Sequence, residues 1–240
     1  MKPFVIFGDS LAVAYSEAAE LRTDGMFVGG PLMGGRRFYD RHAWVEDGRL
    51  QVSKAFKPAY ERFLTAAGET SFEDCVGRIV ISLGMTSGPV FNGVDRFNGS
   101  HWSVFHRGAE PGGSKFYLSD GALRRIMADA QANILSIYEH GLTRGLFAAA
   151  FAPPPPPDHL SDKYGAHLVH EIARYVEEPV RKLLTAHGVP LVEVKGTTTQ
   201  TGGLKKKYVG VDGFHGNVEY AGLVLDKALE VLGSREPAHA

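Results

Sequence analysis

The sequence predicts an α/β protein, a three-layer α/β/α sandwich with a parallel sheet of about five strands. Short apolar runs, which suit strands buried on both faces, alternate with longer segments whose apolar residues recur at helical spacing. No internal repeat and no clear linker divides the 240 residues. We therefore expect a single domain over residues 1–240, with right-handed connections between its parallel strands.

Apolar runs that end at glycine mark the strands of the first half of the chain. The runs over 4–7 and 78–83 end at Gly8 and Gly84, and a shorter one over 26–28 ends at the breaker Gly29-Gly30-Pro31. Segments rich in alanine, leucine and glutamate mark the helices. In chain order we expect a strand over 4–7, a helix over 10–21, a strand over 26–28, a polar, aromatic region over 36–52, a helix over 56–67 and a strand over 78–83.

The second half of the chain resumes the alternation after a long interruption. Residues 88–120 are rich in glycine, asparagine, serine and aromatic residues without a sustained period, and we expect a long loop excursion there. The five prolines of 153–157 cannot join a sheet. The remaining elements are expected to be a helix over 123–140, a strand over 145–152, a helix over 167–186, a strand over 191–194 and a helix over 218–232.

Composition and charge exclude several classes of protein. The chain is 44% hydrophobic and 22% charged, which is the ordinary balance of a globular protein and excludes a wholly disordered one. Its 26 lysines and arginines against 27 acidic residues give a formal charge of -1, which lacks the basic excess that a nucleic-acid partner requires. The single cysteine, Cys75, excludes an internal disulfide and a cysteine-based zinc site.

No segment of the sequence predicts a membrane partner, a metal or a cofactor. The longest apolar run, over 145–152, is far shorter than the about 20 residues of a membrane helix, and the N-terminal run is too short for a signal peptide. His167 and His170 stand one helical turn apart beside Glu171, but no third metal ligand is suggested. We expect a soluble, cytoplasmic protein that holds no cofactor.

Two short motifs near opposite ends of the chain carry groups that can perform nucleophilic chemistry. Ser10 follows the first strand and opens a helix, where free N–H groups favour a developing anion. Asp212 stands three residues before His215, just ahead of the last helix. A serine attacks only when a histidine takes its proton, and that histidine needs an acceptor on its other nitrogen. Each motif also has a purely structural interpretation, a helix cap for Ser10 and a turn for Asp212.

The combination resembles the SGNH, or GDSL, hydrolases. Gly8-Asp9-Ser10-Leu11 directly after the first strand and Asp212-x-x-His215 directly before the last helix match that family, and they bracket nearly the whole chain. The resemblance implies a flavodoxin-like parallel sheet. It also implies that Ser10 is the nucleophile, His215 the general base and later acid, and Asp212 the residue that orients the histidine. Asp9 would tie down the turn.

The resemblance also implies an oxyanion hole made of three donors. The first is the backbone N–H of Ser10 itself, and the second is a glycine N–H after the second strand. Gly34 fits this glycine best, with Gly35 and Gly30 as alternatives, and each of these glycines could equally serve only to shape a turn.

The third donor departs from the family pattern. Where the family has an asparagine in a Gly-x-Asn-Asp motif, this chain reads Gly84-Met85-Thr86-Ser87. The hydroxyl of Thr86 is the candidate donor here, and Asn92 and Asn98 are alternatives from the loop that follows. The loss of one such donor costs about 100- to 1,000-fold in turnover.

The expected activity is hydrolysis of an ester through an acyl-enzyme. The substrate would be a small-molecule or carbohydrate ester, and we expect a carbohydrate O-deacylase such as an acetylesterase, because Trp102, Phe105 and Asn98 of the long loop suit a sugar. Two other functions stay open. An O-acyltransferase could use the same three residues with a sugar hydroxyl in place of water, and a non-catalytic glycan-binding relative would account for the changed third motif.

Overall fold

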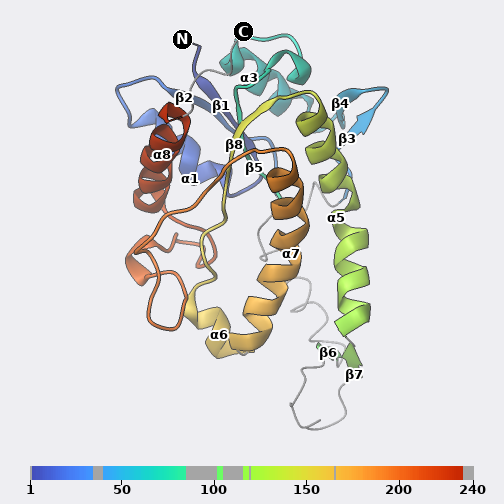
Figure 1. Cartoon of the computed structure of the whole chain (residues 1–240), viewed down its shortest axis with the longest axis vertical. Coiled ribbons are helices and arrows are strands. Elements are labelled where there is room, and N and C mark those ends of the chain that lie inside the picture. Colours follow the sequence, from blue (N-terminus) through green and yellow to red (C-terminus); the bar gives the residue numbers. More distant parts are fainter. Residues whose placement is uncertain are drawn as a thin grey trace.

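The computed structural model describes residues 2–34, 40–84, 102–104, 116–118, 120–164 and 166–234. Its centre is a five-stranded sheet in the order β2-β1-β5-β8-β9, in which every neighbouring pair is parallel (Figure 1). The predicted parallel sheet is therefore confirmed, and its strand order is that of flavodoxin-like folds. The strands are β1 (Phe4–Gly8), β2 (Phe27–Pro31), β5 (Ile79–Ser82), β8 (Phe147–Phe151) and β9 (Leu191–Val192).

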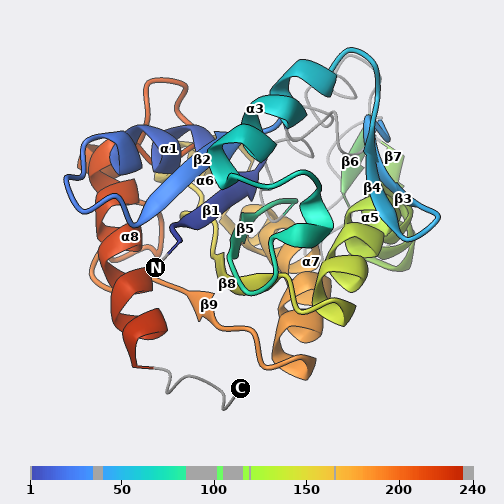
Figure 2. The same cartoon turned by 90° about the horizontal axis from the view of Figure 1, so that it is seen from above.

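Helices cover both faces of this sheet, which completes the predicted three layers. One face carries α1 and α8, which lie side by side, and the other carries α3, α5 and α7 (Figures 1 and 2). The side chains of β1 show why both faces are apolar, because Val5 and Phe7 join the core under one layer and Ile6 joins the core under the other. The helices are α1 (Ala12–Glu20), α3 (Lys57–Ala67), α5 (Asp120–Thr143), α7 (Ala166–Ala186) and α8 (Val218–Gly233).

A third hydrophobic cluster extends the protein beyond the carboxyl edge of the sheet. Here α5 and α7 run past the strands and meet the short helix α6 (Asp158–Tyr164), which the sequence did not predict (Figure 1). This cluster, called the lower cluster below, consists of the buried residues Met127, Leu160, Val169, Ile172, Tyr175 and Val176. It lies on the side of the sheet where Ser10 follows β1.

The second strand is longer than the sequence indicated. Gly29-Gly30-Pro31, expected to break the strand, instead continues β2, with Gly29 opposite Ile6 of β1 and Pro31 opposite Gly8. A Cβ atom on Gly29 would lie 2.7 Å from the carbonyl oxygen of Ile6, so this glycine permits close pairing where a larger residue would not fit. Proline is tolerated because β2 is the edge strand.

Part of the polar region over 36–52 is a β-hairpin. Strands β3 (Ala43–Glu46) and β4 (Arg49–Val52) pair antiparallel across a two-residue turn. Both turn residues, Asp47 and Gly48, have positive φ angles of 50° and 68°, the left-handed geometry that Asp-Gly favours in hairpins. The Asp47-Gly48 pair is the local sequence signal for this hairpin.

The predicted excursion over 88–120 falls mostly outside the described residues. Within it, β6 (Trp102–Val104) and β7 (Phe116–Leu118) pair with each other in parallel. Among the described residues, no helix combines the length and apolar character needed to cross a membrane. The same part of the chain holds no group of three acidic, histidine or cysteine side chains that could bind a metal ion.

Candidate active site

Ser10 lies in the tight turn between β1 and α1, at the carboxyl edge of the sheet. The turn passes close to β5, because a Cβ atom on Gly8 would lie 2.1 Å from the carbonyl oxygen of Ser82. Glycine is therefore required directly before the Asp9-Ser10 pair. The Ser10 side chain is only partly buried, so its hydroxyl remains accessible at this edge.

The structure brings the three predicted reactive side chains together from opposite ends of the chain. The Oγ atom of Ser10 lies 3.0 Å from Nε2 of His215, a residue 205 positions later in the sequence. The other ring nitrogen, Nδ1, is hydrogen-bonded to Oδ2 of Asp212. A carboxylate can only accept, so Nδ1 carries the proton and Nε2 is left to accept the proton of Ser10.

The Asp212 carboxylate organises its own turn as well as the histidine. Its Oδ1 accepts hydrogen bonds from the backbone N–H groups of Phe214 at 2.9 Å and His215 at 3.0 Å, which leaves Oδ2 for the imidazole. Gly213, between Asp212 and Phe214, has a φ of +74°, a left-handed backbone conformation that favours glycine. Partial burial raises the pKa of Asp212, but the hydrogen bonds from His215 and from the two backbone N–H groups outweigh it and hold that pKa below its ordinary value of 3.8.

Phe214 anchors this turn to the lower cluster, a role that the sequence analysis missed. Its partly buried ring packs against that cluster and lies edge-on to the ring of His159 in α6, with a centroid separation of 6.2 Å. The backbone beyond is closed by the N–H of Gly210, which donates to the carbonyl oxygen of His215 at 2.7 Å. The backbone around His215 is thus held by the packing of Phe214 and by the hydrogen bond from Gly210.

Asn217 fixes the start of the helix that follows His215. Its side-chain oxygen accepts from the backbone N–H of Tyr220 at 3.1 Å, and its side-chain nitrogen donates to the carbonyl oxygen of Lys207 at 2.7 Å. An asparagine directly before an apolar helix is a recognised N-cap signal, so the sequence did contain the information that places this residue.

Asp9 does tie down the turn. Its side chain is fully buried, Oδ1 accepts from the N–H of Leu11 and Oδ2 from the N–H of Gly84, each at 3.0 Å. Burial raises the pKa of Asp9, although these hydrogen bonds and the nearby His215 act in the opposite direction. The carboxylate therefore joins the end of β1 to the end of β5 beneath the reactive serine.

Some of the predicted oxyanion donors lie among the described residues, and the others lie outside them. Within the described residues, no hydrogen bond occupies the backbone N–H of Ser10, as an oxyanion donor requires. Gly34 is exposed in the loop after β2, at the same sheet edge as Ser10, because Pro31 at the end of β2 pairs with Gly8. The alternative Gly30 lies inside β2, where a Cβ atom would meet Oγ of Ser16 at 2.7 Å.

The other candidate donors, namely Gly35, Thr86, Asn92 and Asn98, lie outside the described residues. Gly84, which precedes them, is well placed by its contacts. Its carbonyl oxygen accepts from Nε2 of Gln131 at 3.3 Å, and a Cβ atom on Gly84 would lie 2.5 Å from Cγ2 of Ile134 in α5. The start of the unusual third motif is therefore fixed next to Asp9.

Comparisons with known proteins find partial structural similarity at low sequence identity. No protein-family model matches the chain, and no curated protein matches it. A candidate acylhydrolase from Bacteroides fragilis is similar over 96% of this chain and 88% of its own, with 12% identity and a TM-score of 0.48. A GDSL-like lipase from Bacteroides thetaiotaomicron is similar over 96% and 89%, with 13% identity and a TM-score of 0.48. The structure of TesA is similar over 95% and 98%, with 14% identity and a TM-score of 0.33. Function is therefore inferred from the side-chain geometry of the site.

Proposed function

We propose that this chain is a serine ester hydrolase of the GDSL type that works through a covalent acyl-enzyme. The observation that carries this function is the continuous hydrogen-bonded series from Asp212 through His215 to Ser10 at the carboxyl edge of the sheet. A histidine that both contacts a serine hydroxyl and is held by a carboxylate is the arrangement that activates serine.

The reaction would begin when Oγ of Ser10 attacks the ester carbonyl carbon while Nε2 of His215 takes the hydroxyl proton. The carbonyl oxygen becomes an anion, for which the free N–H of Ser10 is the nearest donor, and Gly34 and Thr86 are proposed as the other two. His215 then gives its proton to the leaving alcohol, and the acyl group stays on Ser10. His215 then takes a proton from water, which attacks the acyl carbonyl carbon. The imidazolium returns that proton to Oγ of Ser10 as the bond between Oγ and the acyl group breaks and the acid leaves.

Asp212 would act by orienting the imidazole and by stabilising its positive charge. The depressed pKa of Asp212 supports this role, because the carboxylate stays ionised whenever His215 has to carry the transferred proton. Asp9 has no such access, since it is fully buried and both its oxygens are hydrogen-bonded to the backbone.

For the substrate class we propose an acylated carbohydrate, with an acetyl group as the acyl part. The near-zero net charge of the chain supports an uncharged ester, because such a substrate needs no steering field. The aromatic and amide residues of the 88–120 segment support a sugar as the alcohol part.

Turnover of p-nitrophenyl acetate by purified variants tests the activity. We expect Ser10→Ala and His215→Ala each to lower kcat by at least about 1,000-fold. Ser53→Ala is a matched control, because Oγ of Ser53 lies 3.0 Å from Nδ1 of His42 and thus forms a second serine–histidine contact. Full activity in Ser10→Ala would refute the proposed nucleophile. Binding of a glycan without turnover of its acetylated form would instead favour a non-catalytic glycan-binding protein.

A further inference from the structure

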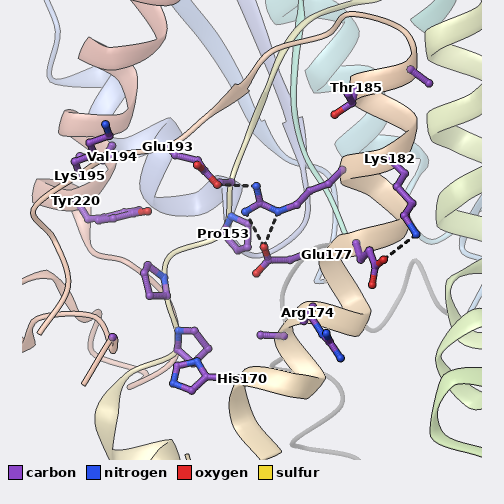
Figure 3. A pocket seen from close by; sticks show the side chains of 18 residues that line it. Pro153, His170, Arg174, Glu177, Lys182, Thr185, Glu193, Val194, Lys195 and Tyr220 are labelled. Atoms are coloured by element: carbon purple, nitrogen blue, oxygen red, sulfur yellow. Dashed lines mark hydrogen bonds and ion pairs between the residues drawn. The ribbon is translucent and has the colours of Figure 1, made fainter. Parts of the chain in front are cut away.

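A cavity opens at the same edge of the sheet, beside β8 and β9 and away from Ser10. It has a volume of about 930 Å³ and lies between α7, the segment after β8 and the first turn of α8 (Figure 3). Small apolar side chains of the segment after β8 line it, together with one from α7 and one after β9, namely Ala152, Pro153, Pro155, Pro156, Ala173 and Val194. None of the three proposed reactive residues contributes to this cavity.

The charged side chains around the cavity are largely paired with one another. Arg181 binds Oε2 of Glu177 through Nε and Nη2 at 3.0 and 2.8 Å, and its Nη1 lies 2.6 Å from Oε1 of Glu193 (Figure 3). Lys182 pairs with Glu178 at 2.7 Å. The cavity therefore offers hydrogen-bonding capacity without a strong net charge, which suits an uncharged ligand better than an ion.

Tyr220 brings a hydroxyl group to the cavity. The residue is only 3% exposed, yet it lines the cavity, and its hydroxyl points toward Pro153 (Figure 3). No hydrogen bond to this hydroxyl occurs within the described part of the chain. This hydroxyl can therefore donate a hydrogen bond to a molecule bound in the cavity.

Two carboxylate oxygens lie on the same cavity as this hydroxyl. Arg181 occupies Oε2 of Glu177 and Oε1 of Glu193, so Oε1 of Glu177 and Oε2 of Glu193 can still accept hydrogen bonds. Glu177, Glu193 and Tyr220 all line this cavity, from α7, the segment after β9 and α8 (Figure 3). One donor and two acceptors beside an apolar wall match a ring that has hydroxyl groups at its edge and C–H groups on its face.

The cavity is close enough to Ser10 to act with it. β8 is two strands from β1, and adjacent strands are about 4.8 Å apart, so the ends of these strands are about 10 Å apart. The hydroxyl of Tyr15, in the helix α1 that follows Ser10, donates to the carbonyl oxygen of Ala152 at 3.4 Å. A short oligosaccharide can extend over this distance along the sheet edge.

We infer that this cavity binds an uncharged sugar unit, through the Tyr220 hydroxyl, the free oxygens of Glu177 and Glu193 and the apolar wall after β8. As a subsite for the alcohol part of the ester, this role rests on the proposed function. As a glycan-binding cavity, it does not depend on catalysis.

Binding to the Ser10→Ala protein tests the cavity without any turnover. Backbone NMR shifts are recorded while cellobiose or N,N′-diacetylchitobiose is added, and inorganic phosphate and butylamine serve as anionic and cationic probes. We expect a disaccharide to shift backbone amide resonances of Ala152, residues 193–195 and Tyr220. Adding Tyr220→Phe should weaken that affinity about five- to tenfold, since one hydrogen bond is lost and the ring packing is kept.

Glu193→Gln and Glu219→Gln form a matched pair of carboxylate substitutions. Glu219 is adjacent to Tyr220 on α8 and pairs with Lys207, but it does not line the cavity. We expect weaker disaccharide binding only for Glu193→Gln. The inference is wrong if neither disaccharide shifts these resonances, if only phosphate or butylamine does so, or if Tyr220→Phe binds as tightly as its parent.

Turnover of p-nitrophenyl acetate by the unsubstituted protein separates the two proposals. Disaccharide binding without turnover would leave the cavity as a glycan site and reject the esterase. Turnover without disaccharide binding would reject only the proposal that the cavity binds a sugar.

Discussion

Gly84 provides a quantitative test of how the third motif is built. Its φ is +67°, and a Cβ atom there would lie 2.5 Å from Cγ2 and 2.8 Å from Cδ1 of Ile134. In Gly84→Ala, the left-handed backbone costs about 1–2 kcal/mol and the overpacking about 1–3 kcal/mol, which together give about 2–5 kcal/mol. At about 2–4 °C per kcal/mol for a chain of this size, we expect Tm to fall by about 4–20 °C.

Gly77→Ala isolates the backbone part of this cost. Gly77 has a similar φ of +64°, but nothing lies within 4 Å of the position that its Cβ would take. We expect this control to lose about 1–2 kcal/mol, or about 2–8 °C in Tm. Thermal unfolding of both variants under one set of conditions gives the comparison.

A double substitution isolates the steric part. Ile134→Ala destabilises the parent by creating a cavity, but in the Gly84→Ala protein it also removes both clashing atoms. We therefore expect Ile134→Ala to cost about 1–3 kcal/mol less in the Gly84→Ala background than in the parent. If Gly84→Ala loses no more stability than Gly77→Ala, or if the two substitutions are additive, the close packing of Gly84 on α5 is wrong.

Four further predictions concern the site and the core. Asp212→Asn should lower kcat for p-nitrophenyl acetate by about 100- to 10,000-fold, and unchanged kcat would contradict its orienting role. The folded-state pKa of Asp212 is depressed below 3.8, so its contribution to stability is present above that pH and is lost as the pH falls through the folded-state pKa. Asp212→Asn should therefore lower Tm more at about pH 7 than at about pH 3. Equal losses of Tm at both pH values would refute this. Phe214→Ala should reduce kcat by about 10- to 100-fold and Phe214→Leu by much less, with KM little changed in both, whereas equal kcat values would remove Phe214 as the anchor of the turn. Burial raises the pKa of Cys75 to about 11, so iodoacetamide should modify it only after unfolding, and rapid labelling of the native protein would contradict its burial.

The sequence predicted the central sheet well because buried parallel strands leave a strong local signal. The apolar runs that became β1, β5 and β8 are continuous and end at turns, so strand and side-chain burial could be inferred together. The end of β2 was predicted wrongly for the opposite reason. Gly29 breaks a strand by propensity, but here it is needed because the backbone of β1 approaches within contact distance, which only the tertiary structure shows.

The sequence motifs predicted which side chains meet at the candidate site but not the contacts that support them. Ser10, Asp212 and His215 belong to short motifs with recognisable chemistry, and the structure places them in hydrogen-bond contact. Phe214 could not be assigned, because the surface it packs on is assembled from α5, α6 and α7. The pairing of Arg181 with Glu193 at the cavity beside β8 and β9 could not be predicted from the sequence either, since the two residues come from separate elements.

Covalent labelling of Ser10 tests the central function most directly. The intact protein is treated with a fluorophosphonate, and the adduct is located by mass spectrometry after digestion. We expect one adduct per chain, on Ser10, formed at a rate that His215→Ala lowers by at least about 1,000-fold. Absence of an adduct, an adduct on another serine such as Ser53, or equal labelling of His215→Ala would contradict the proposed catalytic arrangement.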